Sequence, residues 1–149
     1  MTPKTLSKSR FIMGLECPQK LIYDRDKRFR NLKREDSFLA SLADGGFQVG
    51  EFAKAHFPGG HDIVTLDMSE AVKQTQALLR AGDCVIFEAA IRYQNCFIRV
   101  DVLEKNSDRL VIHEVKAKSF NSNEERPFLT QKGEPSSKWR SYLYDVAFQ

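Results

Sequence analysis

Three acidic residues and one lysine fall in neighbouring segments that are rich in β-branched and apolar residues. Glu88, Asp101 and Glu114 lie one to a segment, and Lys116 follows Glu114 by two positions. Carboxylates are ligands that Mg²⁺ and Mn²⁺ prefer, and a lysine beside such an ion can orient water or stabilise developing charge. These residue types suit the hydrolysis of phosphodiester bonds, provided that the fold brings them together.

The three segments are predicted to be antiparallel strands because short polar connections separate them. The strands are predicted at Cys84–Tyr93, Cys96–Glu104 and Leu110–Lys116, with connections at Gln94-Asn95 and Asn106–Arg109. If the first connection is a two-residue turn, Tyr93 pairs with Cys96 and Glu88 falls opposite Asp101. The first two acids would then lie side by side.

The second connection extends this row to a third acid. As a four-residue loop it pairs Lys105 with Leu110 and places Asp101 opposite Glu114. Like charges in a row destabilise a sheet, and a divalent cation is the simplest group that would relieve their repulsion. Arg99 and Lys116 are expected on the same face. Neither turn has the Asn-Gly signature of a secure hairpin, and an exposed cross-strand ion pair is the alternative reading of Glu114 and Lys116.

Helices are predicted around this sheet by apolar spacing and capping residues. They are expected from Ser7 or Ser9 to Leu15, from Pro18 through Tyr23, from Asp36 to His56 with a kink or break at Gly45-Gly46, from Ser69 to Gly82, and from Lys138 onward. The polar stretch Asn121–Ser137 is predicted to be a loop. One domain is expected, with an entry segment at 1–35, helices at 36–81, a catalytic sheet at 84–116 and a flanking helix at 138–149.

Composition indicates an ordinary globular protein of 149 residues with a net charge of +3. No stretch is apolar enough for a membrane span, no signal peptide is apparent, and three cysteines give no disulfide framework, so we expect a cytoplasmic protein. The basic segment Arg25–Arg34 is either a phosphate-binding stretch, with Arg28 and Arg30 as substrate-binding candidates, or a solvated loop. The uncapped end at Gln149 suggests a fragment of a longer protein with further domains.

Several short motifs resemble, in order, those of RecB-like nucleases of the PD-(D/E)XK superfamily, which include CRISPR-associated members. The matching stretches are Leu6–Phe11 with Leu15-Glu16-Cys17-Pro18, Phe87-Glu88-Ala89-Ala90, Arg99–Leu103 and Ile112-His113-Glu114-Val115-Lys116. The resemblance implies a restriction-endonuclease-like α/β fold, in which a central mixed sheet begins with an antiparallel meander and carries helices on both faces. It also implies that Asp101 and Glu114 bind metal, that Lys116 is catalytic, and that Tyr142, Asp145 and Gln149 lie on a helix beside the site.

The sequence departs from this family at two positions. Many relatives have a metal-binding His after a Gly in the second helical segment, whereas the corresponding stretch here, Gly46-Phe47-Gln48-Val49-Gly50-Glu51, has none. Either Glu51 substitutes for it or that ligand is absent. Some relatives bind an iron–sulfur cluster through one early and three distant cysteines, but here Cys17 stands alone. An iron–sulfur cluster is therefore not expected in this chain by itself.

The sequence thus predicts a deoxyribonuclease, acting as an exonuclease or end-processing enzyme on single-stranded DNA or on DNA ends. One or two Mg²⁺ or Mn²⁺ ions would bind Glu88, Asp101 and Glu114, and Tyr142 and Gln149 would contact the nucleic acid. Two alternatives stay open. The first is a nucleic-acid-binding module that keeps the nuclease fold without turnover, and the second is an interaction domain whose acids bind only a stabilising cation.

Overall fold

The structure of this chain is a computed structural model that describes residues 5–24, 26, 28–29, 36–123 and 125–149. The chain divides into two compact units. The sheet unit comprises Met1–Leu6 and Arg30–Ala117, and the helical unit comprises Ser7–Phe29 and Lys118–Gln149. The prediction that both belong to one nuclease domain stays a prediction.

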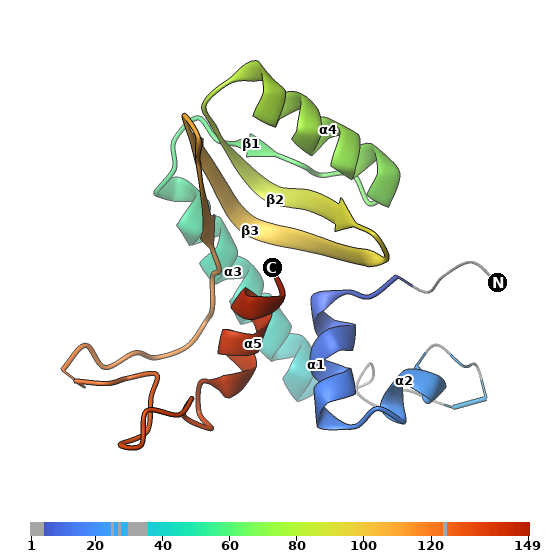
Figure 1. The fold of residues 1–149 in the computed structure, drawn as a ribbon, viewed down its shortest axis with the longest axis vertical. Coiled ribbons are helices and arrows are strands. Elements are labelled where there is room, and N and C mark those ends of the chain that lie inside the picture. Colours follow the sequence, from blue (N-terminus) through green and yellow to red (C-terminus); the bar gives the residue numbers. More distant parts are fainter. Residues whose placement is uncertain (1–4, 25, 27, 30–35, 124) are drawn as a thin grey trace. The chain divides into compact units, whose positions relative to one another are not determined.

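The sheet unit contains a four-stranded mixed sheet (Figure 1). Its strands are β1 His61–Asp62, β2 Cys84–Tyr93, β3 Cys96–Asn106 and β4 Arg109–His113, in the order β1-β2-β3-β4. Strand β1 runs parallel to β2, and the other pairs are antiparallel. The predicted α/β fold with a meander in a mixed sheet is therefore confirmed, and β1 is an additional strand that the sequence did not allow us to place.

The predicted strand register is also confirmed. Tyr93 pairs with Cys96, and Lys105 pairs with Leu110. The second connection is shorter than predicted, because Asn106 pairs with Arg109 and leaves a two-residue turn. In each hairpin the first turn residue has a left-handed backbone, with φ of 51° at Gln94 and 53° at Ser107.

Strand β4 ends at His113, three residues earlier than predicted. The backbone N–H of Val115 donates a hydrogen bond to Oδ2 of Asp101 (2.7 Å). The N–H of Val115 is therefore not available for a backbone hydrogen bond between β3 and β4. This accounts for the early end of the strand. The segment Glu114–Lys116 therefore follows the strand and does not form part of it.

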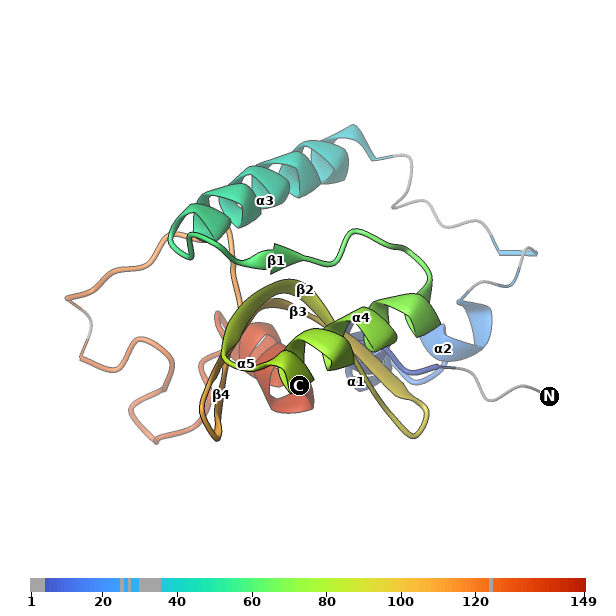
Figure 2. The ribbon, with the colours of Figure 1, turned by 90° about the horizontal axis from the view of Figure 1, so that it is seen from above.

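Two helices, α3 Ser37–Ala55 and α4 Met68–Ala81, belong to the sheet unit, and in Figure 2 strands β1 and β2 run between them. Helix α4 begins at Met68, one residue earlier than predicted, and is capped by Asp67, whose carboxylate accepts from the N–H of Glu70 (2.8 Å). Helix α3 continues through Gly45-Gly46, so of the predicted kink or break, the break is wrong. Each glycine costs only about 1 kcal/mol in a helix, which the rest of the helix outweighs.

The centre of the sheet is packed on helix α4. Ile86, Val100, Val102 and Leu103 are almost fully buried. From α4, the buried Thr75 accepts a hydrogen bond at Oγ1 from the N–H of Ala90 (2.9 Å). This bond satisfies a backbone donor of β2 beyond the end of its pairing with the short β1, and a buried donor left without an acceptor would cost about 1–3 kcal/mol.

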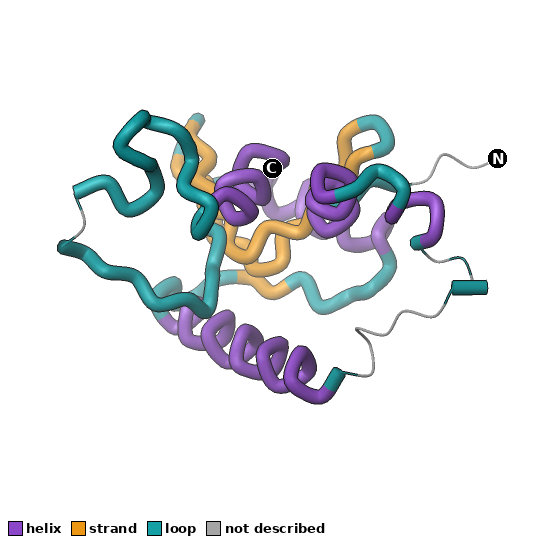
Figure 3. Tube along the Cα trace, turned by 90° about the horizontal axis from the view of Figure 1, so that it is seen from below, coloured by secondary structure: helices purple, strands orange, loops and turns teal. Residues whose placement is uncertain are grey.

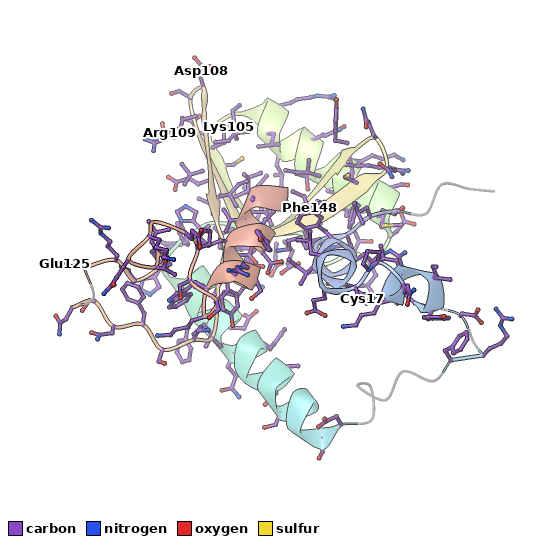
Figure 4. All side chains as sticks on the ribbon, turned by 60° about the horizontal axis from the view of Figure 1, so that its bottom comes forward. Cys17, Lys105, Asp108, Arg109, Glu125 and Phe148 are labelled. Atoms are coloured by element: carbon purple, nitrogen blue, oxygen red, sulfur yellow. The ribbon has the colours of Figure 1, made fainter. Side chains whose placement is uncertain are left out.

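The tip of the β3–β4 hairpin is tied to the C-terminal end of α4. Nζ of Lys105 donates to the carbonyl of Leu79 (2.7 Å), and the N–H of Ser107 donates to Oδ1 of Asp83 (2.7 Å). Figure 4 labels Lys105 at this hairpin. A lysine at a helix C-terminus satisfies an unpaired carbonyl and complements the helix dipole. These bonds hold the hairpin against α4.

The helical unit contains α1 Lys8–Glu16, α2 Lys20–Tyr23 and α5 Arg140–Phe148, with a long loop before α5 that is drawn in teal in Figure 3. Helix α1 is capped by Ser7, one of the two predicted candidates. Phe11 stacks on Phe148 with ring centroids 4.7 Å apart, which joins α1 to α5. No helix in the described part of the chain is long and apolar enough to cross a membrane.

Candidate metal and catalytic site

A pocket of about 660 Å³ lies within the sheet unit, between α3, the segment after β1, and strands β2 and β3. Its charged lining residues are Glu51, Lys54, Asp62, Glu88, Arg99 and Asp101. Acids outnumber cations here, so the pocket has a net negative charge. Such a pocket attracts cations before it attracts a phosphate.

Glu88 and Asp101 lie at one level of the sheet, as the register predicts. Glu88 falls between the pairs Phe87–Val102 and Ala89–Val100, opposite Asp101. Its backbone is left-handed, with φ of 55°, although it lies inside a strand. For a residue with a Cβ this conformation costs about 1–2 kcal/mol, and such outliers gather at functional sites. The level of the two acids is therefore a locally strained part of the sheet.

Glu114 follows β4 at the same level of the sheet. Because Val102 pairs with His113, the next position in the register sets Glu114 opposite Asp101. The Glu114 side chain is only 5% exposed and forms an ion pair with Nζ of Lys116. In the described part of the chain, Glu88 and Asp101 line the pocket, whereas Glu114 and Lys116 are paired with each other beside it.

The acidic side chains of the pocket are the candidate ligands for a divalent cation. No three His, Cys, Asp or Glu side chains among the described residues converge closely enough to hold a metal ion. Mg²⁺ keeps several waters and commonly takes only one or two protein carboxylates. The pair Glu88 and Asp101 fits that smaller requirement.

Glu51, the possible additional ligand, lies in the same pocket but is engaged by Lys54. Nζ of Lys54 lies 2.9 Å from Oε1 of Glu51 and 2.5 Å from Oδ2 of Asp62. Burial lowers the pKa of Lys54, but the hydrogen bonds and charges of Asp62 and Glu51 outweigh it, so that the pKa is raised on balance. The ammonium therefore stays charged and joins α3 to β1.

The ring of Phe87 lies next to the Lys54 ammonium of this ion pair. Nζ of Lys54 lies 5.7 Å from its centroid, within cation–π range. The ring also packs directly on Gly60, where a Cβ would lie 2.4 Å from it. Sequence reasoning missed Lys54 and Asp62 as pocket residues. The only sequence signal was the i,i+3 spacing of Glu51 and Lys54, which predicts a helix surface pair and not a pocket.

Arg99 holds one wall of the pocket in place. Its guanidinium donates to the carbonyls of Ile63 (3.1 Å) and Thr65. These two bonds fix the segment that follows β1, where Val64 and Leu66 are 81% and 93% exposed. Arg99, which was predicted on the same face as the acids, lines the pocket together with Glu88 and Asp101. Its role in this structure is to position the segment.

The predicted substrate-binding residues lie in the helical unit or outside the described residues. Tyr142 and Gln149 belong to the α5 region, where Nε2 of Gln149 donates to the carbonyl of Asp145 (3.3 Å). Arg28 is exposed and forms an ion pair with Asp26 (2.7 Å). Arg30 and most of the basic segment Arg25–Arg34 lie outside the described residues.

Comparisons of the chain with models of known protein families, with curated proteins and with solved structures found no match. The class that the structure itself defines is an α/β protein with a mixed sheet and an acidic pocket beside two of its strands.

Proposed function

We propose that this chain is a metal-dependent nuclease of the RecB-like PD-(D/E)XK type, which hydrolyses DNA phosphodiester bonds as an exonuclease or end-processing enzyme. The observation that supports this most is the position of Glu88 and Asp101, which lie opposite each other in the sheet and both line the pocket. Glu114 follows at the same level with Lys116 two residues later, in the spacing that the family's motif requires.

Glu88 and Asp101 would hold Mg²⁺ or Mn²⁺, with Glu114 as a further ligand. A bound ion of this kind supplies an activated water and neutralises charge on the phosphate oxygens. The chain would hold the two carboxylates in position before the ion binds. The carboxylate of Asp101 is oriented by the N–H of Val115, and Glu88 is fixed by its strained backbone.

Lys116 would orient the attacking water or stabilise charge on the phosphate. Its side chain is 32% exposed, and an ammonium has three N–H donors, so its bond to Glu114 is compatible with a second contact. The same ion pair balances the charge of the buried Glu114 carboxylate. Lys116 thus combines a structural role with the proposed catalytic one.

The experiment is to incubate end-labelled single- and double-stranded DNA with the chain in Mg²⁺, Mn²⁺ or EDTA, alongside a Lys116→Ala variant prepared in the same way. The proposal expects products that shorten from an end with either metal, no products in EDTA, and strongly reduced cleavage by the variant. DNA that is bound but stays intact in every condition would instead support the non-catalytic binding module. The absence of both binding and cleavage would favour an interaction domain.

A further inference from the structure

A second group of residues in the chain combines aromatic rings, two of them exposed, with lysines. This aromatic patch consists of Phe120, Phe128, Trp139 and Tyr142 together with Lys118 and Lys138, all within the helical unit. It contains none of the acidic residues assigned to the nuclease site. Only Tyr142 was expected to contact nucleic acid.

The rings of the patch form a connected group around Trp139. The centroid of Trp139 lies 5.4 Å from that of Phe128, 6.1 Å from that of Phe120 and 5.9 Å from that of Tyr142. Trp139 itself is only 7% exposed and is the buried centre of the group. Phe120 and Phe128 stack on each other with ring centroids 5.9 Å apart, yet they are 53% and 43% exposed, so part of each ring remains open to solvent. A cluster that only stabilised the loop would be expected to bury these rings as well.

Two lysines lie over the same rings. Nζ of Lys118 is 4.8 Å from the centroid of Trp139 and 4.6 Å from that of Tyr142, and it donates to the carbonyl of Lys138 (2.9 Å). Nζ of Lys138 lies 5.4 Å from the Trp139 centroid. Between Lys118 and Tyr142 the sequence has five Lys or Arg residues and three Glu, an excess of two positive charges. The patch therefore offers cations beside flat apolar faces.

One polar atom of the patch is also unsatisfied. Nε1 of Trp139 is buried and has no hydrogen-bond acceptor among the described residues. Buried donors of this kind are rare, and each needs an acceptor from water, from a rearrangement or from a ligand. A ligand that carries many acceptors would suit the patch.

We propose that the aromatic patch binds single-stranded DNA, with bases stacked on Phe120 and Phe128 and phosphates next to Lys118 and Lys138. Bases stack on aromatic side chains whatever their identity, and lysines beside the rings neutralise the backbone, which is the combination that single-strand-binding surfaces use. Paired bases in a duplex do not present their faces, so duplex DNA fits the patch poorly. This inference adds a strand-binding surface to the proposed nuclease, but its test does not depend on cleavage.

The test uses the full 149-residue chain in EDTA with a fluorescein-labelled oligonucleotide of thymidines. Binding is followed by anisotropy and by the emission of Trp139, the only tryptophan in the chain. We expect the oligonucleotide to quench Trp139, and we expect Phe120→Ala/Phe128→Ala to weaken binding by about tenfold or more. The control is Tyr93→Ala, which removes a still more exposed ring (73%) from the sheet unit and should bind like the unmodified chain.

Two further variants test base stacking and phosphate binding separately if the alanine variant is poorly folded. Phe120→Tyr/Phe128→Tyr keeps flat rings and should retain binding. Lys118→Gln/Lys138→Gln should reduce the slope of log affinity against log salt by about 1.4, since each phosphate contact on a single strand contributes about 0.7. No saturable binding, equal binding by the folded alanine variant, equal loss in Tyr93→Ala, or an unchanged salt slope would each overturn the proposal. A chain that binds the strand in EDTA but never cuts DNA with metal would retain this inference and contradict the nuclease.

Discussion

At the scale of single residues, the unusual feature of the pocket is a glutamate with a left-handed backbone inside a strand. The register in the sequence places Glu88 opposite Asp101, and the structure has the same register. The φ of 55° at Glu88 was not predictable, because side-chain alternation assumes an extended backbone at every position. Strain at this position is consistent with selection for the carboxylate and not for strand stability.

This strain can be measured with two substitutions at Glu88. Both Glu88→Gly and Glu88→Ala remove the carboxylate, but only glycine adopts a positive φ without a steric cost. We expect Glu88→Gly to be the more stable of the two by about 1 kcal/mol in urea denaturation, the reverse of the usual order in a strand. Ala89→Gly, at the neighbouring position of β2, is the control and should be destabilising. If alanine is the more stable residue at position 88, the strain assigned to this position is absent.

A second prediction concerns the ion pair between Glu114 and Lys116. Because Glu114 is 5% exposed, Lys116→Met removes the cation next to a buried carboxylate and should destabilise the chain by roughly 2 kcal/mol, less than for a fully buried pair. Adding Glu114→Gln should recover most of that loss, because the buried charge is then gone. Thermal and urea unfolding of the two single variants and the double variant give the coupling energy.

The same variants separate the structural role of Lys116 in the ion pair from its proposed catalytic role. The double variant should be stable yet inactive, because it lacks both the proposed ligand and the proposed catalytic lysine. Additive effects of the two substitutions on stability would contradict the ion pair. Activity in the double variant would contradict the role assigned to both residues.

At the scale of elements, helix α3 contains three glycines that its own geometry does not require. Among the described residues, a Cβ at Gly45, Gly46 or Gly50 would meet nothing within 4 Å, and none of the three has a positive φ. Gly46 and Gly50 line the pocket, whereas Gly45 does not. The helix thus keeps a bare backbone beside the pocket at a cost to its own stability.

Alanine substitutions should separate the effect of these glycines on helix stability from their effect on the pocket. Gly45→Ala, Gly46→Ala and Gly50→Ala should each stabilise the chain by about 0.5–1 kcal/mol and raise the Tm by a few degrees. Only Gly46→Ala and Gly50→Ala should change the KM for DNA, since only they add a methyl group to the pocket wall. Equal KM values for all three variants would show that the glycines have no role in substrate binding.

Lys54 connects α3 to β1, and its effect should depend on pH. Burial lowers its pKa, but Asp62 and Glu51 raise it further, so the folded pKa lies above the unfolded value of about 10.4. A raised pKa stabilises the fold below the unfolded pKa, and that stabilisation is lost as pH rises through the folded value. The stability difference between the unmodified chain and Lys54→Gln should therefore be constant near neutrality and shrink above about pH 10.4. Lys73→Gln, on the exposed face of α4, controls for the loss of a positive charge, and a difference that grows with pH would contradict the ion-pair network.

At the scale of the whole molecule, the α/β fold and the pairing of β2, β3 and β4 were predictable because short turns fix the register of hairpins. The two-residue strand β1 was not, since His61-Asp62 has no β-type pattern. Contacts that depend on tertiary structure were also beyond the sequence. Lys54 reaches Asp62 across a turn, and the N–H of Val115 leaves the ladder for Asp101.

The division into two compact units was not predicted either. The helical unit joins residues from both ends of the chain, Ser7–Phe29 and Lys118–Gln149, and local sequence patterns do not report such distant contacts. The predicted site is divided in the same way. Glu88, Asp101, Glu114 and Lys116 belong to the sheet unit, whereas Tyr142 and Gln149 belong to the helical unit.

The nuclease proposal is tested most directly by comparing DNA cleavage by Asp101→Asn and Asp83→Asn in Mn²⁺. Both aspartates accept a backbone N–H at 2.7 Å, from Val115 and Ser107 respectively, so asparagine removes the same charge and retains an acceptor at both sites. Only Asp101 lines the pocket. We predict similar unfolding free energies for the two variants, a loss of cleavage of more than about a hundredfold in Asp101→Asn, and full cleavage in Asp83→Asn. Equal cleavage by the two variants, or no cleavage by the unmodified chain, would contradict the proposed function.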